Sequence, residues 1–285
     1  MKIGWIGLGA MGTPMATRLC DANLEVSVYN RTESKAAHLK EKGVAVYTSP
    51  IDLAAKVDLI FIMLSDKVAI DAVLAPKFWE QMSKKIVVNM STIAPLESLS
   101  LEKTAQKHQV TYLEAPVSGS LGAAKAGALL ILAAGDEKVV AQLKPVLVHL
   151  GSQTFYLGKI GQGTGAKLSI NSLLAQMGVA YSEALLLAKR LGVDAELFLQ
   201  IIGQSGMNSP LFQAKKGMWL QDSYPAAFSL KLMLKDIRLA NNEAGEAIQL
   251  PFLSKAQELY SQAEKSGLGE MDMAAVYHYL EKGEH

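Results

Sequence analysis

The first half of the chain alternates between short apolar runs of strand length and longer segments in which apolar residues have helical spacing. Helical spacing is clearest over residues 12–23 and over residues 33–43. The second of these segments ends at Gly43. Strands that alternate with helices predict a largely parallel sheet covered by helices on both faces. The apolar runs of strand length are residues 2–8, 25–30, 58–65, 85–91, 110–116, 128–135 and 154–158.

The pattern changes after about residue 163. Residues 164–191 form one long helical pattern without proline, apolar around much of its circumference, and such a helix is usually buried against other helices or another subunit. We therefore predict an α/β domain of Rossmann type over residues 1–163, followed by an all-α domain over residues 164–285. A long interdomain helix joins the two, and the glycine-rich stretch 158–165 is the joint.

A glycine-rich turn follows the first strand. Gly7, Gly9 and Gly12 fit the pattern G-x-G-x-x-G, in which the glycines allow a tight turn, close approach of a pyrophosphate, and close packing of helix on strand. The pyrophosphate would lie at the N-terminus of the following helix, where free N–H groups and the helix dipole favour an anion. Alone the pattern is a weak signal, but here it lies between a strand and a helix and a second strand follows, as a dinucleotide site requires.

The end of the second predicted strand indicates which dinucleotide is bound. NAD sites often place an acidic residue there to accept hydrogen bonds from the ribose hydroxyls. This chain has Asn30, which carries no charge, followed by Arg31, which can pair with a 2′-phosphate, and by Thr32. We therefore predict NADP(H) rather than NAD(H), with the alternative that Arg31 is only a solvated surface charge.

Composition narrows the class of partner. Of 285 residues, 28 are basic and 27 acidic, a balance that argues against nucleic acid or an anionic membrane as the main partner.

The single cysteine, Cys20, cannot form an internal disulfide and lies in a pattern typical of a small buried hydrophobe. No stretch reads as a signal peptide or a transmembrane span, so we expect a cytoplasmic protein. No metal is expected, because the five histidines are scattered without ligand spacing. They are His38, His108, His149, His278 and His285.

Lys167 is the first candidate for chemistry. It stands near the start of the long predicted helix, with Asn171 one turn later on the same face. Such a lysine can be a surface residue with a buried stem. It can equally be a general acid whose pKa is lowered by burial and by the positive potential of the helix N-terminus.

Three further segments carry polar residues of interest. Residues 114–127 include Ser118, Gly119 and Ser120, which could offer a hydroxyl and N–H groups to a carboxylate or could simply close a strand. Residues 89–93 follow a strand at the end where open α/β sheets bind ligands. Lys235 and Asp236 interrupt an apolar helical pattern.

Together these segments resemble the β-hydroxyacid dehydrogenase family, which is related to 3-hydroxyisobutyrate dehydrogenase, over nearly the whole chain. The matching motifs, in order, are IGLGAMGTPMATRL, MSTI, EAPVSGS, GQGTGAKLSIN and LKDIRLA. Within the family the chain is similar above all to the glyoxylate/succinic semialdehyde reductases. That likeness is carried by YNRTESK, MLSD, EAPVSGS, LLILAAGDE, FYLGKIGQG, SYPAAFSLK and GLGEMDMAAVYHYLEK.

The resemblance implies catalytic roles for matching positions. Lys167 matches the family's catalytic lysine, which protonates the carbonyl oxygen as the hydride arrives, and Asn171 matches the residue that orients substrate and lysine. Ser118 and Gly119 match the group that holds the substrate carboxylate. Thr92 matches a residue between nicotinamide and substrate.

The resemblance also implies the remainder of the two binding sites. The positions that match residues closing the pocket from the helical domain are Phe228, Lys235 and Asp236. The implied cofactor-binding residues are Gly7, Leu8, Gly9, Ala10, Met11, Gly12, Asn30, Arg31, Thr32, Met63, Leu64, Ser65, Thr92 and Lys235.

The implied reaction is NADPH-dependent reduction of succinic semialdehyde to 4-hydroxybutyrate and of glyoxylate to glycolate. Independently, the long predicted helix has more apolar surface than one small domain covers, so we expect a homodimer or homotetramer. The chain departs from many members in having Ser120 where they have a glycine, and LGAAKAG follows where the reductases carry charged or bulky residues. These departures indicate a different mouth of the substrate pocket.

Three alternatives stay open at this stage. One is a 3-hydroxyisobutyrate-type dehydrogenase that oxidises a β-hydroxyacid with NAD(P), although Arg31 argues against NAD. A 6-phosphogluconate-type reaction is disfavoured by the short chain. The third is a non-catalytic dinucleotide-binding protein, like a chromatin-associated member of the family that lacks the lysine; Lys167 and Asn171 argue against it.

Overall fold

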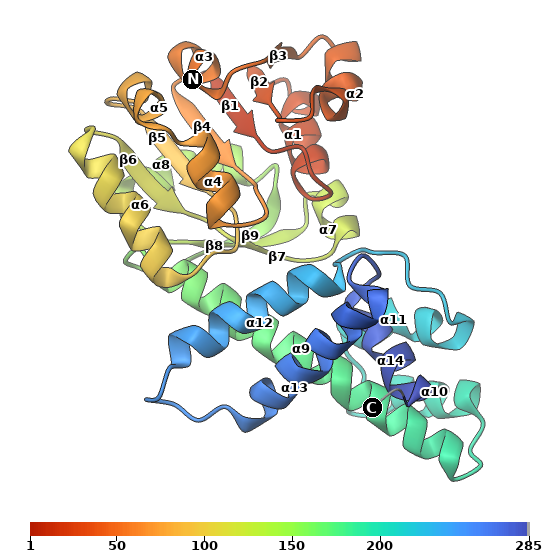
Figure 1. Ribbon diagram of the computed structural model, residues 1–285. Helices are drawn as coiled ribbons and strands as arrows, with labels where there is room; N and C mark the ends of the chain where they lie inside the picture. The colour runs from red at the N-terminus through yellow and green to blue at the C-terminus, as the bar shows by residue number, and fades with distance from the viewer. Residues whose placement is uncertain (284–285) are drawn as a thin grey trace. The chain divides into compact units, whose positions relative to one another are not determined.

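The computed structural model describes residues 1–283, and its first elements form a six-stranded, wholly parallel sheet in the order β3-β2-β1-β4-β5-β6 (Figure 1). This is the strand order of a doubly wound dinucleotide-binding fold, so the predicted Rossmann-type domain is confirmed. The strands are β1 (Ile3–Ile6), β2 (Val26–Tyr29), β3 (Ala45–Tyr47), β4 (Leu59–Ile62), β5 (Ile86–Asn89) and β6 (Thr111–Glu114).

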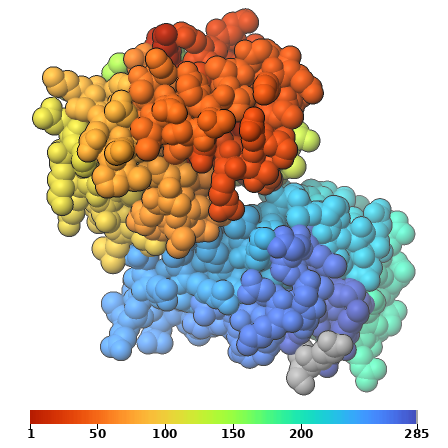
Figure 2. Space-filling view, turned by 45° about the horizontal axis from the view of Figure 1, so that its top comes forward, coloured from red at the N-terminus to blue at the C-terminus, as the bar shows by residue number. Residues whose placement is uncertain are grey.

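Helices and side chains cover both faces of this sheet. Successive residues of a strand point to opposite faces, so Trp5 packs in one apolar core and Ile6 in the other. The space-filling view shows one face of this unit, whose atoms are coloured from red through yellow to green (Figure 2). The helices are α1 (Gly12–Asp21), η1 (Glu33–Ala36), α2 (Ala37–Glu41), α3 (Pro50–Lys56), α4 (Lys67–Val73), α5 (Pro76–Gln81) and α6 (Pro95–Lys107).

Two apolar runs expected to be strands pair outside the parallel sheet. Strands β7 (Val117–Ser118), β8 (Leu129–Ala133) and β9 (Gly151–Tyr156) form a second sheet in which β7 is antiparallel to β8. Pro116 has no N–H to donate, and it separates β6 from β7. The expected single sheet is therefore two sheets. Helices α7 (Leu121–Ala126) and α8 (Glu137–Leu147) lie between these strands in the chain.

The long predicted helix is present as α9 (Gln162–Arg190). The chain divides into two compact units, Met1–Lys167 and Leu168–His285, and this division falls within α9. The predicted domain boundary at residue 163 stays a prediction. Cys20, expected to be buried, is half-buried and packs against the first unit's core.

The second unit is helical, as predicted, and has an apolar core of its own around Phe212, Trp219 and Tyr260. Several helices begin at a proline after a residue with extended or non-helical backbone, as expected for a proline in the first turn. Its elements after α9 are α10 (Ala195–Gln204), α11 (Pro210–Gln221), α12 (Leu230–Ala244), α13 (Pro251–Ala263), η2 (Glu264–Leu268), η3 (Met273–Ala275) and α14 (Val276–Lys282).

Candidate active site

The strand register brings the predicted cofactor segments to one edge of the parallel sheet. Ile6, the last residue of β1, is paired with Tyr29 of β2 and with Ile62 of β4. The residues that follow these three are Gly7, Asn30 and Met63, which therefore share the carboxyl edge. This is the edge at which open α/β sheets bind ligands, next to the point where the strand order reverses between β1 and β4.

The glycine loop has the geometry of a dinucleotide cradle. Gly7 has a φ of +101°, and a Cβ there would lie 2.1 Å from the carbonyl oxygen of Met63. A Cβ on Gly9 would meet no heavy atom within 4 Å, so that side of the loop is open to a ligand. The N-terminus of α1 has neither a side-chain cap nor an acidic residue in its first turn, which leaves its N–H groups suited to an anion.

A pocket of about 410 Å³ opens over this loop. It is framed by the start of α1 on one side and by α7 on the other, and two lysines contribute to its wall. Lys35 and Lys125 were not singled out by the sequence, because each stands alone in an ordinary surface pattern. The lining residues are Leu8, Gly9, Ala10, Thr13, Pro14, Lys35, Leu121 and Lys125.

Asn30 has a structural task that the sequence did not reveal. Its Oδ1 accepts a hydrogen bond of 2.8 Å from the N–H of Leu8, and its Nδ2 donates one of 2.9 Å to the carbonyl oxygen of Thr32. The side chain thus ties the glycine loop to the turn that carries Arg31 and Thr32, both of which are exposed. An uncharged amide can make this pair of bonds because it both donates and accepts.

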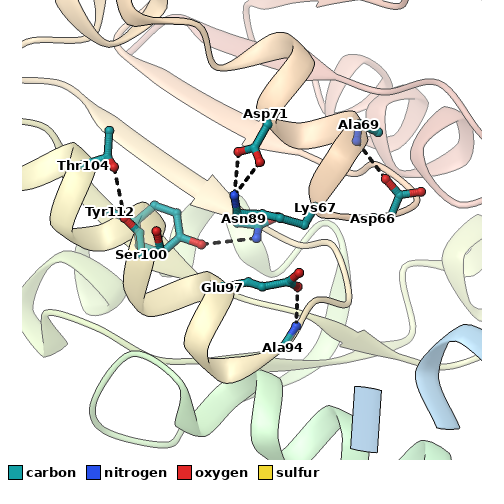
Figure 3. A network of polar contacts seen from close by, with 10 residues as sticks. All are labelled: Asp66, Lys67, Ala69, Asp71, Asn89, Ala94, Glu97, Ser100, Thr104 and Tyr112. Carbon is teal, nitrogen blue, oxygen red and sulfur yellow. Dashed lines mark hydrogen bonds and ion pairs between the residues drawn. The ribbon is translucent and has the colours of Figure 1, made fainter. Parts of the chain in front are cut away.

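The segment after β4 is held from the neighbouring strand. The N–H of Leu64 donates to Oγ of Ser91, at 2.9 Å, and the N–H of Met63 donates to the carbonyl oxygen of Ile6. Ser65 Oγ donates to Asp66, whose other oxygen caps α4 through the N–H of Ala69 (Figure 3). Thr92, one residue beyond Ser91, is half-buried in the loop after β5.

The predicted carboxylate-binding segment lies at the turn between β7 and α7. Ser118 ends β7 and is half-buried, and Gly119 follows it with a φ of +147°, a backbone conformation that favours glycine. Ser120 has a different use, because its hydroxyl accepts a hydrogen bond of 3.3 Å from the N–H of Ala123 and caps α7. Ser120 is therefore the N-cap residue of α7.

Lys167 lies in the second turn of α9, and the start of that helix is anchored by a buried acid that sequence reasoning missed. Glu114, at the end of β6, has no exposed surface, and its Oε1 accepts hydrogen bonds from the N–H groups of Gly161, Gly163 and Thr164. The only signal for it was a charged residue at the end of an apolar strand pattern, in the stretch VTYLEAP.

A buried chain of hydrogen bonds connects Glu114 to the middle of the sheet. Ser98 Oγ donates to Glu114, and Tyr112 donates in turn to Ser98 across 3.1 Å. Asn89 donates to the Tyr112 hydroxyl at 3.2 Å (Figure 3), and its Oδ1 accepts from the N–H of Ser91. Burial raises the pKa of Tyr112, so its hydroxyl keeps the proton that this direction of donation requires.

In the second unit, Asn171 is 1% exposed and makes a specific contact with α12. Its Nδ2 donates a hydrogen bond of 2.6 Å to Oδ2 of Asp236, which is also buried. The other oxygen of Asp236 lies 2.7 Å from Nζ of Lys235. These three predicted residues are thus brought together, with the orientation of the Asn171 amide set by Asp236.

Phe228 stands in the segment before α12, which is held by another pair of residues that the sequence did not reveal. Asp272 accepts hydrogen bonds from the N–H groups of Ala227 and Phe228, at 3.0 and 3.1 Å. Its Oδ1 lies 2.6 Å from Nζ of Lys215, in an ion pair whose side chains are 0% and 8% exposed. The backbone at Phe228 is therefore fixed by a buried ion pair.

Within residues 1–283 no group of three or more histidine, cysteine or acidic side chains could hold a metal ion, and His285 lies outside the described residues. Among the same residues, no helix combines the length and the apolar character needed to cross a bilayer.

Comparison with known proteins decides the family. Residues 2–158 match the model of the NAD-binding domain of 6-phosphogluconate dehydrogenase, and residues 161–280 match the NAD-binding model of NADP-dependent 3-hydroxyisobutyrate dehydrogenase. The chain is 37% identical over 280 residues to glyoxylate/succinic semialdehyde reductase 1 of Arabidopsis thaliana, covering 97% of both chains. The chain belongs to the β-hydroxyacid dehydrogenase family. Human mitochondrial 3-hydroxyisobutyrate dehydrogenase is 32% identical, over 99% of this chain and 87% of its own length.

Solved structures agree with this membership of the β-hydroxyacid dehydrogenase family. The 3-hydroxyisobutyrate dehydrogenase of Mycobacterium tuberculosis, solved with L-serine, has a TM-score of 0.88 at 27% identity over 98% of both chains. A 3-hydroxyisobutyrate dehydrogenase of Salmonella typhimurium has a TM-score of 0.90 at 25% identity, over 98% of this chain and 99% of its own. The protein is therefore an NAD(P)-dependent oxidoreductase of the β-hydroxyacid dehydrogenase type, as its resemblance indicated.

Proposed function

We propose that this enzyme uses NADPH to reduce small aldehydes that carry a carboxylate, with succinic semialdehyde and glyoxylate as substrates. The observation that carries the proposal is similarity, over 98% and 97% of this chain, to two Arabidopsis thaliana glyoxylate/succinic semialdehyde reductases, at 36% and 37% identity. The cofactor preference is supported by Asn30, which ties the exposed Arg31 turn to the glycine loop. Cofactor, carboxylate and proton donor would be held by segments of the first unit.

Each proposed residue has a defined task. Bound NADPH would supply the hydride. Ser118 and Gly119 bind the substrate carboxylate and so set the distance from carboxylate to reacting carbonyl. Lys167 donates a hydrogen bond to the carbonyl oxygen, stabilises the charge that grows there, and transfers its proton. Asn171, held by Asp236, orients the lysine one turn earlier on the helix. The pocket-closing roles of Phe228 and Lys235 stay predictions.

The direct test compares substrates and cofactors in one assay. Purified protein is given succinic semialdehyde, glyoxylate or methylglyoxal with NADPH or NADH, and cofactor oxidation is followed by absorbance. We expect NADPH-dependent turnover of the two carboxylate-bearing aldehydes and much weaker turnover of methylglyoxal. The proposal fails if none is reduced while 3-hydroxyisobutyrate is oxidised with NAD. That second function has some support, because mitochondrial 3-hydroxyisobutyrate dehydrogenases are 31–32% identical to this chain.

Replacing Arg31 with aspartate should reverse the cofactor preference. The change removes a guanidinium from the turn held by Asn30 and places a carboxylate where a 2′-phosphate would lie. Charge-assisted hydrogen bonds contribute about 1.5–3 kcal/mol, so kcat/KM for NADPH should fall by about 10- to 100-fold relative to that for NADH. The measurement is the ratio of kcat/KM values for the two cofactors at one aldehyde concentration.

Lys103→Asp is the matched control for that variant. Lys103 is exposed in the third turn of α6 of the same unit, so its replacement makes the same change in net charge away from the proposed phosphate site. The ratio should stay unchanged in the control. Equal ratios in wild type and Arg31→Asp would remove Arg31 from cofactor selection.

We also propose a homodimer or homotetramer. The helical unit exposes large apolar side chains, including Leu173 and Leu187 of α9, each 60% exposed, and Leu197 and Ile201 of α10. An apolar surface of this kind usually marks an interface. Light scattering after gel filtration should give at least twice the chain mass of 30.6 kDa, and a mass equal to one chain at micromolar concentration would contradict the proposal.

A further inference from the structure

Glu114 is a buried carboxylate for which the proposed reaction has no direct use. Its Oε1 accepts three hydrogen bonds from the main chain at the start of α9: 2.8 Å from the N–H of Gly161, 2.7 Å from that of Gly163 and 3.2 Å from that of Thr164. Its Oε2 accepts a hydrogen bond from the hydroxyl of Ser98 and a longer one, of 3.3 Å, from the hydroxyl of Thr164, which shares its single hydrogen with the carbonyl oxygen of Gly161. All five contacts are with donors, so both oxygens act only as acceptors.

The free-energy cost of burying the Glu114 carboxylate must be offset by interactions inside the protein. Glu114 is 0% exposed and makes no ion pair with any residue of the described chain, although burying an unpaired charge is costly. The compensation comes from the five donors together with the positive end of the 29-residue helix α9. The anion that this helix N-terminus would attract is therefore supplied by the protein's own sheet.

The anchored turn leads directly to Lys167. In an α-helix the N–H of residue 167 bonds to the carbonyl of residue 163, and residues 164 and 167 lie on the same side, one turn apart. Glu114 thus holds the two positions on which the Lys167 backbone rests. The same residue ends β6, four positions before Ser118, the proposed carboxylate-binding residue.

We propose that Glu114 is a positioning residue for Lys167, an inference that rests on the proposed function of that lysine. By anchoring the first turn of α9 on the end of β6, it sets where the Lys167 ammonium lies relative to the Ser118 segment. A displacement of about 1 Å between reacting groups can cost about 100-fold in rate. Glu114 touches neither substrate nor cofactor in this account.

The test is the variant Glu114→Gln, which keeps the shape of the side chain and the acceptor facing Gly161, Gly163 and Thr164 but loses the charge. We expect kcat for aldehyde reduction to fall by about 10- to 100-fold, while the dissociation constant of NADPH, measured by fluorescence titration, changes less than about twofold. A variant that merely loosened the whole domain would weaken NADPH binding as well.

A double-mutant cycle with Lys167→Ala identifies the route of the effect. If Glu114 acts through Lys167, adding Glu114→Gln to Lys167→Ala should lower kcat by less than about twofold further, because residues that act as one unit are not additive. The control is Glu97→Gln. Glu97 also caps a helix of this unit, by accepting a 2.8 Å hydrogen bond from the N–H of Ala94 (Figure 3), and its loss should leave kcat unchanged.

The outcomes separate this inference from the proposed function. Full activity in Lys167→Ala overturns the role of the lysine itself, and with it this inference. Loss of activity in Lys167→Ala with none in Glu114→Gln overturns only the positioning role, as do effects that multiply in the double variant. If Glu114→Gln does not fold, Ser98→Ala replaces it in the cycle. Ser98→Ala removes one hydrogen-bond donor to the Glu114 carboxylate, at a helical position where alanine is favourable. The positioning role then requires that the effects of Ser98→Ala and Lys167→Ala on kcat are likewise non-additive.

Discussion

Replacing Lys167 with alanine should lower turnover of carboxylate-bearing aldehydes by about 10²–10⁴-fold, the range typical of a lost general acid. The carbonyl oxygen would then gain negative charge without a cation to stabilise it or a proton to accept. NADPH binding should be retained, because the glycine loop and the Arg31 turn are held by Asn30 and not by Lys167. The measurements are single-turnover rates and fluorescence titration of NADPH.

Two further variants make this result specific. Lys159→Ala removes an exposed lysine eight positions earlier in the same glycine-rich stretch and should leave turnover unchanged. Lys167→Arg keeps the positive charge on a side chain that does not release its proton, so it should recover little of the lost rate. Turnover in Lys167→Ala within about twofold of wild type would exclude this lysine as the proton donor.

The second large effect is expected on stability. Replacing Lys215 with methionine should lower the free energy of unfolding of the helical unit by about 3–5 kcal/mol, because it leaves the fully buried Asp272 carboxylate without its cation. Methionine keeps much of the apolar stem of lysine, so the loss reflects charge more than packing. Asp272 also accepts hydrogen bonds from the backbone at Ala227 and Phe228. We therefore expect KM for the aldehyde to rise in the variant.

The measurement is the midpoint and slope of urea unfolding. The matched control is Lys231→Met, which breaks an ion pair with Glu270 in the same unit whose side chains are 45% and 81% exposed. An exposed pair contributes about 0–1 kcal/mol, so this control should hardly shift the midpoint. Equal shifts in the two variants would show that burial of the Lys215–Asp272 pair has no special energetic role.

Much of the fold could be predicted from the sequence because the signals are local. The apolar run at β1, the glycine turn and the apolar run at β2 each depend on neighbouring residues, and their order implies parallel pairing. The pairing of β7, β8 and β9 in a second sheet could not be predicted in the same way. An apolar run shows that a strand is buried, but it does not show which strand it will pair with.

The residues of the candidate site likewise fall into those predicted from the sequence and those whose roles appear only in the structure. Gly7 and Arg31 were predicted because their motifs are short and each has a direct chemical meaning, whereas the catalytic role of Lys167 was predicted only from the resemblance to the β-hydroxyacid dehydrogenase family. The tasks of Asn30, Ser120 and Glu114 are visible only from their partners. Glu114, for example, binds the N–H of Gly161, which is 47 residues further along the chain.

The sequence by itself determined the class of enzyme, through a glycine loop between strand and helix and through motifs that resemble the β-hydroxyacid dehydrogenase family along nearly the whole chain. Each of these motifs depends on residue types at short spacing. Only the tertiary structure decided what holds the predicted segments in place. The Asn30 amide holds the glycine loop, the Glu114 carboxylate holds the start of α9, and the buried pair of Lys215 and Asp272 holds the backbone at Phe228. The physical reason is burial. A polar or charged side chain looks the same in a sequence whether it is solvated or buried, and only the folded chain supplies the partners that make its burial stable.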